Sequence, residues 1–389
     1  MKKDRLAARC SLFIVLSLVT VISLGATSSA TGNIVKSDLT GTWLIAMRGT
    51  TGCGFVAMQA NMTINSSGVG TGTLQTHGDC GDSSLTGQTF TINKLAADGS
   101  GTAGLSCGTG CGWSFNIQVS PDRSKINLVD VAAVNPGNFV EGVAILSSPS
   151  GDVAISDLTG SWQATLYGKG GCGIGSDVVT FTLNTGGVAN NATTTSHTTG
   201  CGDGTSTGNT FTVQSLNSDG SGTANLTCGT GCGFNFNIQV SPDRSTFNLV
   251  DVSSANPGNF LAGTAINDST AGKIVATNLA GKWQAAIYGQ GGCGVASTLV
   301  TFTLNAKGVA TNATSTSHSA GCGDSTSSGN TFAVLSLAAN GGGTANLSCG
   351  TGCGFNFDIQ VSPDRSTFNL VDVSPANPGN FLIGTAIHE

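Results

Sequence analysis

Charged side chains are scarce in this chain: Lys, Arg, Asp and Glu together make up 9% of its 389 residues. The balance is acidic, because residues 31–389 contain 11 basic and 20 acidic side chains, a net charge of about −9. Nucleic acids and anionic membrane surfaces attract basic patches, so neither is an expected partner. Disorder is not expected either, because it needs high charge with low hydrophobicity, and 39% of the residues are apolar.

Helical periodicity and catalytic motifs are also missing. No segment places apolar residues at the three- to four-residue spacing of an amphipathic helix. The sequence contains no pair of nucleophile and base, no phosphate-binding loop, no haem motif and no calcium-binding loop, and it has only 4 histidines. We therefore expect a protein that is not an enzyme and has no cofactor.

The start of the chain has the composition of a leader. A basic segment over residues 2–9 precedes an apolar stretch over 11–24 and small residues at 28–30. This order predicts a secretory signal peptide over residues 1–30. The apolar stretch is shorter than the about 20 residues that span a membrane. We expect a mature chain without a membrane span, either secreted or located at the cell surface or in the periplasm.

The remainder of the chain is a threefold repeat. Trp43, Trp162 and Trp283 begin equivalent segments and are 119 and 121 residues apart. Residues 228–266 and 349–387 differ at only three positions. Such self-similarity indicates tandem copies of one unit, and each unit is long enough for its own core. The three predicted domains are residues 31–148, 149–267 and 268–389.

Alternating apolar and polar residues predict strands throughout each unit. In the second unit, Phe234, Phe236 and Ile238 alternate with Asn235 and Asn237. Each unit has eight such segments, separated by turns that contain Gly, Asn, Asp or Pro. An eight-stranded meander protects its two edge strands most simply by pairing them with each other and closing into a barrel. We predict an all-β fold of three tandem eight-stranded antiparallel up-and-down β-barrels, with β-sandwiches as the alternative.

Alternate turns of a meander lie at the same end of the barrel. The odd-numbered connections are glycine-rich, and in the second unit they include Gly168–Ser176 and His197–Asn209. All cysteines after the leader lie in or beside such connections. We therefore predict one open rim per barrel, which carries long loops and the cysteines and which we call the cysteine rim.

The cysteines indicate disulfides. Twelve remain after the leader, four per unit at similar spacing, as expected for an oxidising compartment. Cys228 and Cys232 flank a three-residue turn and could bond, and Cys172 and Cys201 would then join neighbouring loops, but three connectivities are possible. A zinc site with the rim histidines is the alternative; paired Cys-x2-Cys spacing is absent, so we expect no metal. The disulfide candidates are Cys53, Cys80, Cys107, Cys111, Cys172, Cys201, Cys228, Cys232, Cys293, Cys322, Cys349 and Cys353.

Two sets of polar residues are candidate ligand contacts at the rim. One histidine per unit precedes a Cys-Gly-Asp triplet by three or four residues. One aspartate per unit, at the end of the seventh strand, lies an even number of residues from the apolar residues of that strand, so it is expected to face the barrel interior with them. A carboxylate inside a barrel must be hydrogen-bonded or hydrated. It could therefore bind a polar group of a ligand or fix the conformation of the loop that follows it. The candidates are His77, Asp82, Asp130, His197, Asp203, Asp251, His318, Asp324 and Asp372.

The opening of each unit resembles that of the calycins, the group of lipocalins and avidins. Asp38–Trp43 and Asp157–Trp162 carry the Leu-Thr-Gly-x-Trp pattern, and the third copy departs from it at Ala280. The resemblance implies an eight-stranded barrel closed at one end by the tryptophan, with Arg244 in a turn where it could stack on Trp162. The biotin-binding tryptophans of avidin have no counterparts.

Two functions fit these observations. The first is a secreted or cell-surface repeat protein with a structural or adhesive role, in which repetition supplies reach and avidity for an unknown surface partner. The second is a calycin-like binder of small apolar or glycan ligands at the cysteine-lined rim.

Overall fold

The computed structural model describes residues 32–389 except 109–110, 132–136, 229–232, 253–257, 269–272, 350–353 and 375–378. The predicted signal peptide lies outside the described residues. Within them, no helix is long and apolar enough to cross a membrane.

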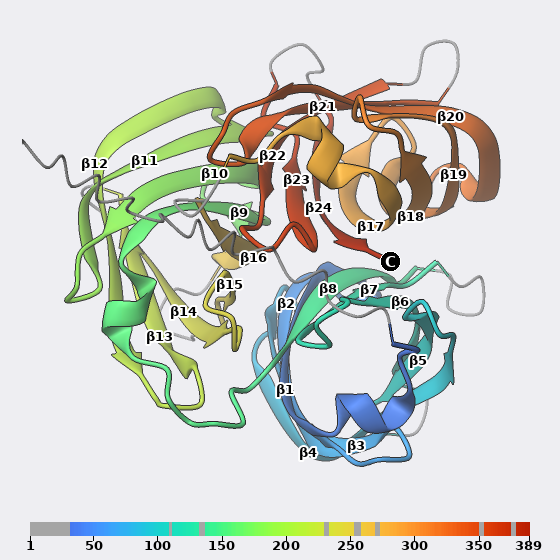
Figure 1. Cartoon of the computed structure of the whole chain (residues 1–389). Coiled ribbons are helices and arrows are strands. Elements are labelled where there is room, and N and C mark those ends of the chain that lie inside the picture. Colours follow the sequence, from blue (N-terminus) through green and yellow to red (C-terminus); the bar gives the residue numbers. More distant parts are fainter. Residues whose placement is uncertain are drawn as a thin grey trace, which may run out of the picture. The chain divides into compact units, whose positions relative to one another are not determined.

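The described residues form three closed antiparallel barrels of eight strands each. Each strand pairs with its neighbours in sequence, and the first strand of each repeat also pairs with the last (Figure 1). The predicted fold class is therefore confirmed. The strands of each barrel fall within one of the segments 31–148, 149–267 and 268–389.

The strand bounds are equivalent in the three repeats. The first barrel contains β1 (Gly41–Thr51), β2 (Gly54–Ile64), β3 (Val69–Gly78), β4 (Ser83–Leu95), β5 (Ser100–Ser106), β6 (Gly112–Val119), β7 (Lys125–Val129) and β8 (Phe139–Leu146). The second contains β9 (Gly160–Gly170), β10 (Gly173–Leu183), β11 (Val188–Thr198), β12 (Gly202–Leu216), β13 (Ser221–Thr227), β14 (Gly233–Val240), β15 (Thr246–Val250) and β16 (Phe260–Asn267). The third contains β17 (Gly281–Gly291), β18 (Gly294–Leu304), β19 (Val309–Ser319), β20 (Gly323–Leu337), β21 (Gly342–Ser348), β22 (Gly354–Val361), β23 (Thr367–Val371) and β24 (Phe381–His388).

The cysteine rim differs from the prediction in one respect. Gly168–Ser176 and His197–Asn209 were expected to be long loops, but β9 continues to Gly170 and β12 already begins at Gly202. The expectation was wrong because residues 202–208 are exposed on both faces, so they show no apolar alternation even though they pair with β11. These two connections of the rim are therefore long hairpins with short turns.

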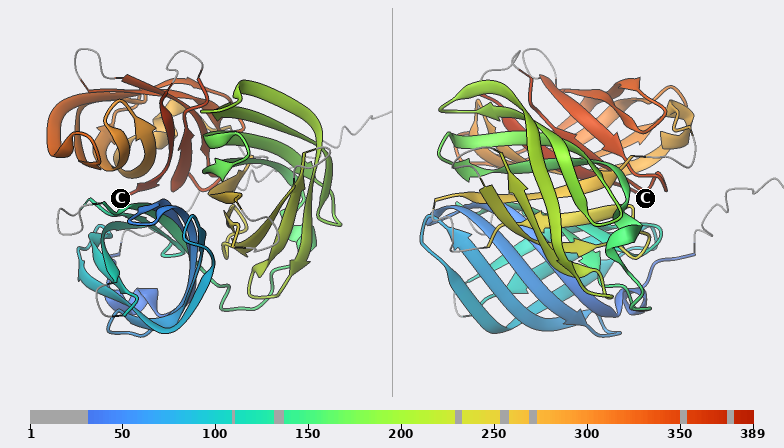
Figure 2. Two further views of the ribbon diagram at one scale, coloured as in Figure 1. Left: turned by 180° about the vertical axis from the view of Figure 1, so that it is seen from behind. Right: turned by 90° about the vertical axis from the view of Figure 1, so that its left-hand side faces the viewer.

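The opposite end of each barrel is closed by a tryptophan and a short 3-10 helix. These helices are η1 (Lys36–Leu39), η2 (Ile155–Leu158) and η3 (Ala276–Leu279). In the second barrel Trp162 is 1% exposed, and its indole nitrogen donates to the Leu158 carbonyl at 2.8 Å. Arg244 also lies at this end, where its guanidinium pairs with Asp152 at 2.9 Å and Asp157 at 3.6 Å. Figure 2 shows η1 against one end of the first barrel.

Equivalent asparagines join the three barrels in a cycle. Asn127 of the first barrel donates to the Gln284 carbonyl of the third at 2.9 Å. Asn248 of the second donates to the Val143 carbonyl of the first at 3.0 Å, and Asn369 of the third donates to the Thr264 carbonyl of the second at 2.8 Å. All five residues of β7, of β15 and of β23 are buried, so the outward faces of these strands are covered by another barrel.

Aromatic side chains from all three repeats meet where the barrels contact one another. The Tyr167 ring lies 5.2 Å from that of Tyr288 and 5.9 Å from that of Phe55, measured between centroids. Arg48, at the position equivalent to the two tyrosines, forms a buried ion pair with Glu141 at 2.6 Å. These contacts give the barrels a shared apolar cluster in addition to their separate cores.

A second ion cluster places one aspartate from each repeat around a single buried lysine. The Lys125 ammonium lies 3.4 Å from Asp122, 3.1 Å from Asp243 and 3.4 Å from Asp364. Lys125 is fully buried, whereas the three carboxylates are about 30% exposed. We call these four residues the Lys125 cluster. Its single cation compensates three anions that the repeated Ser-Pro-Asp-Arg turn brings together.

A candidate ligand cavity in the second barrel

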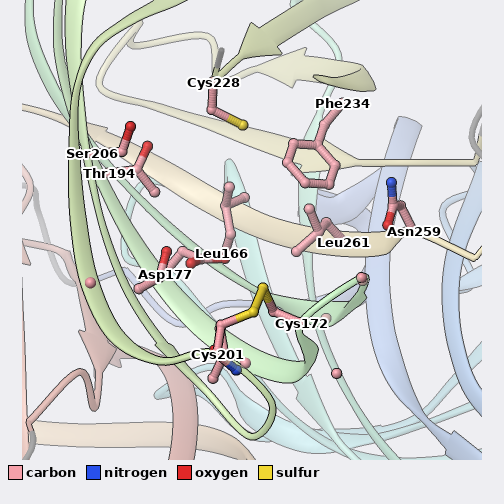
Figure 3. A pocket seen from close by; sticks show the side chains of 18 of the residues that line it. Leu166, Cys172, Asp177, Thr194, Cys201, Ser206, Cys228, Phe234, Asn259 and Leu261 are labelled. Carbon is pink, nitrogen blue, oxygen red and sulfur yellow. A yellow bond between two sulfur atoms is a disulfide. The ribbon is translucent and has the colours of Figure 1, made fainter. Parts of the chain in front are cut away.

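The second barrel contains a cavity of about 570 Å³ below its cysteine rim. Its wall is largely apolar, because Leu166, Leu226, Phe234 and Leu261 contribute to it. Figure 3 shows three of these side chains around one space, with the Cys172–Cys201 disulfide at its side. Cavities of 300–1,000 Å³ with apolar walls and few polar groups are typical of small-molecule sites.

The cavity coincides with smaller side chains than those of the first barrel. There, Met47, Met58 and Trp113 are buried in the core, and Met47 pairs with Met58 across β1 and β2. The equivalent pair in the second barrel is Leu166 and Asp177, and Phe234 takes the place of Trp113. Asp177 and Phe234 have smaller side chains than Met58 and Trp113, whereas Leu166 is about as large as Met47, so the first two replacements leave volume at this end of the barrel.

One of these replacements, Asp177, introduces a carboxylate into the cavity wall. It lies on β10 opposite Ser196 of β11 and is half-buried. Burial raises the pKa of Asp177 to about 6, although a hydrogen bond with the Ser196 side chain partly counteracts this rise. The equivalent residue of the third barrel is Thr298, opposite Ile287, so the barrel itself does not require a carboxylate here.

The other ionisable groups that line the cavity are already paired. Besides Asp177, the described residues that line the cavity include two with charged side chains, Lys169 and Asp203. The Lys169 ammonium binds Asp79 of the first barrel at 2.6 Å, and Asp203 is paired with the Nδ1 atom of His197. Asp177 is thus the ionisable lining group that has no ionic partner among the described residues.

The predicted rim histidines lie between barrels. The His77 ring packs edge-on against Phe260 of the second barrel at 4.6 Å, and its Nε2 atom lies 3.1 Å from the Asn259 carbonyl. His197 stacks on Phe381 at 4.5 Å and His318 on Phe139 at 4.7 Å. Their exposed fractions are 2–4%. Each is paired through Nδ1 with the predicted aspartate of its own repeat, Asp82, Asp203 or Asp324.

Two of the three predicted aspartates that follow the seventh strand contact a neighbouring barrel through their backbone carbonyls. Asp130, Asp251 and Asp372 are fully buried. The hydroxyl of Ser176 donates to the Asp372 carbonyl of the third barrel, and that of Ser297 donates to the Asp130 carbonyl of the first. Of the nine predicted ligand contacts, only Asp203 is among the residues that line the cavity.

Sequence reasoning missed Asp177 because it assigned the residues directly before it, Gly168–Ser176, to a connection between strands. Asp177 has the same parity as Val179 and Phe181, which are buried inside the barrel. That parity is the signal that would have placed a carboxylate inside.

The predicted disulfides are confirmed where the structure describes both cysteines. Cys53–Cys80, Cys172–Cys201 and Cys293–Cys322 join neighbouring connections of the rim, and Cys107–Cys111 closes a hairpin. Cys228 and Cys349 are disulfide-bonded, whereas Cys232 and Cys353 lie outside the described residues. The choice among three connectivities, open from the sequence, is settled for the first repeat.

Comparisons with known proteins identify no family. No family model and no curated protein sequence matches this chain. CghA bound to Sch210972 has 10% identity and a TM-score of 0.23 over 89% of this chain and 87% of that chain. Transferrin binding protein B from serogroup B Neisseria meningitidis has 9% identity and a TM-score of 0.27 over 90% and 77%. These values are too low to transfer a function, and the calycin resemblance remains an interpretation of the opening motif.

The raised pKa of Asp177 predicts a pH-dependent effect of its substitution. The pKa of Asp177 is about 6 in the folded protein, against the usual 3.8. Between pH 3.8 and pH 6 the native protein therefore binds more protons than the unfolded chain. Ionisation of Asp177 destabilises the fold as the pH rises through this range. Asp177→Asn should therefore raise the melting temperature at pH 8, on the order of 2 °C, and leave it unchanged near pH 3. Scanning calorimetry at both pH values tests this, and an equal shift at the two would contradict the assignment.

Proposed function

We propose that this chain is an extracytoplasmic, non-enzymatic binding protein that takes a small, mainly apolar ligand into the cavity of its second barrel. The observation that carries the proposal is the cavity of about 570 Å³ with its apolar wall. The disulfides are consistent with an oxidising compartment, where they are stable.

The contacts between barrels favour this function over an adhesive one. Repetition supplies reach when modules move independently on linkers. Here the asparagine cycle and the Lys125 cluster hold the barrels to one another through buried polar contacts. Such contacts give rigidity rather than reach, and a rigid scaffold helps to preserve a preformed cavity.

The proposal is tested by filling the cavity with the side chains of the first barrel. Asp177→Met with Phe234→Trp reproduces the pattern of Met58 and Trp113, so the fold should tolerate it. Binding of the neutral fluorescent probe N-phenyl-1-naphthylamine to the wild-type protein should weaken at least about tenfold in this double variant, because the apolar volume is occupied.

The third barrel provides a matched control. Thr298→Met with Phe355→Trp makes the same changes at equivalent positions and should leave probe affinity unchanged. No probe binding to the wild type, or equal loss in the two double variants, would exclude the second-barrel cavity as the binding site.

A further inference from the structure

We infer that the ligand of this cavity is an organic cation, an apolar group that carries a protonated amine, with the Asp177 carboxylate as its counter-ion. The inference rests on the proposed function and adds the chemical class of the ligand.

The position of Asp177 is the first argument. Its side chain is directed into the same space as Leu166 and Leu261 (Figure 3). A carboxylate in largely apolar surroundings loses hydration, and the loss is offset only by a cation or several donors. The Ser196 side chain supplies one hydrogen bond, and Lys169, the basic residue among the described lining residues, is bound to Asp79. The cavity therefore has an unmet preference for a positive charge.

The second argument is that this carboxylate has no role that the repeat requires. The strand pairing around Asp177, Met58 and Thr298 is equivalent, and all three barrels close. A residue that costs free energy in the empty barrel, and that two equivalent barrels lack, is best explained by a partner that enters the cavity.

The remaining polar lining suits an ammonium group. An ammonium has three donors and no acceptor. The carboxylate can accept one of them. Hydroxyls of Thr194 and Ser206 also line the cavity: the first accepts a hydrogen bond from Asn209 and the second donates one to it, and each oxygen keeps a lone pair that can accept from an ammonium. An anionic ligand would meet Asp177 and Asp203 as like charges, since the one basic lining residue is already paired. The apolar wall opposite contributes through burial of the rest of the ligand.

Three naphthalene ligands with the same ring and different head groups test the inference: 2-(1-naphthyl)ethylamine, 2-(1-naphthyl)ethanol and 1-naphthylacetate. Each competes with N-phenyl-1-naphthylamine at pH 7.5. In the wild type the amine should bind at least about tenfold more tightly than the alcohol, because an ion pair formed away from bulk water is strengthened. The carboxylate should bind most weakly.

Asp177→Thr, which introduces the residue of the third barrel, should abolish the preference for the amine and change the affinity of the alcohol less than about twofold. Asp358→Asn is the control for total charge: it removes one carboxylate outside the cavity lining, and the second barrel has asparagine at the equivalent position, Asn237. This variant should retain the full preference.

The outcomes separate the two proposals. If the neutral probe and the alcohol bind but the amine has no advantage, the cation is excluded and the cavity remains a binding site. If Asp177→Thr keeps that advantage, Asp177 is not the counter-ion and the inference is overturned in that respect, again with the cavity retained as a binding site. If no ligand competes and the probe does not bind, both the cation and the proposed function are overturned.

Discussion

Replacing Lys125 with threonine is expected to lower the free energy of unfolding by about 3 kcal/mol, the lower end of the range for breaking a buried ion pair, because the buried lysine is the cation that compensates three clustered, partly exposed carboxylates. Threonine fits the strand, since Thr246 and Thr367 occupy the equivalent positions of β15 and β23. The loss therefore reports on charge and not on strand propensity. Without the lysine, the carboxylate oxygens of Asp122, Asp243 and Asp364 lie within 4.8 Å of one another with no cation between them. Denaturant titration measures the loss.

The pH dependence of this loss has a definite sign. Burial would raise the pKa of Asp122 and of Asp243, but the Lys125 charge and hydrogen bonds from neighbouring serines hold both below the usual value of 3.8. A carboxyl group whose pKa is lower in the folded protein than in the unfolded chain stabilises the fold at pH values above its unfolded-state pKa. This stabilisation is lost as the pH falls through the folded-state pKa. The difference between the wild type and Lys125→Thr should therefore be complete at pH 7 and shrink below about pH 4.

A double-mutant cycle separates charge from packing. Asp364→Asn should destabilise the wild type, because it removes an ionic partner of Lys125. In the Lys125→Thr background the same change should stabilise, because it removes one of three repelling charges. A loss that is independent of pH, or an effect of Asp364→Asn with the same sign in both backgrounds, would show that the cluster acts through packing alone.

Truncation of Trp162 to alanine is expected to cost about 3–5 kcal/mol, the usual range for a large buried aromatic side chain. The indole is 1% exposed and packs on Phe247 with 4.7 Å between ring centroids. Its loss also leaves the Leu158 carbonyl without the donor that it has at 2.8 Å. Thermal and denaturant unfolding measure the effect.

Trp113→Phe is the control for Trp162→Ala. Trp113 lies towards the cysteine rim, is 8% exposed and is replaced by Phe234 and Phe355 in the other repeats. We expect it to cost less than about 1.5 kcal/mol, as for a tolerated core replacement. Because Trp162 lies at the end opposite the cavity, the fraction of Trp162→Ala that stays folded should still bind N-phenyl-1-naphthylamine. Equal losses from the two substitutions would argue against the closed end as a dominant source of stability.

The sequence by itself determined the features that depend on local pattern. Period-two alternation, such as Phe234 and Phe236 against Asn235, reports which face of a strand is apolar. Turns at Gly and Pro separate the strands, and eight strands with protected edges close into a barrel. The repeated tryptophan motif marked the closed end, and spacing marked the cysteine rim. Each of these features is set within one repeat.

Only the tertiary structure shows what covers the outward face of each barrel strand. Asn248 alternates with Phe247 and Leu249 as a solvent-facing residue would, yet it is fully buried and donates to carbonyls of the first barrel. The rim histidines and Lys125 are covered in the same way. Periodicity distinguishes the two faces of a strand, but it carries no information on whether water or another barrel lies outside. The cavity is likewise a tertiary property, because its volume depends on the sum of side chains that different strands direct to the same point, Leu166, Asp177 and Phe234 among them.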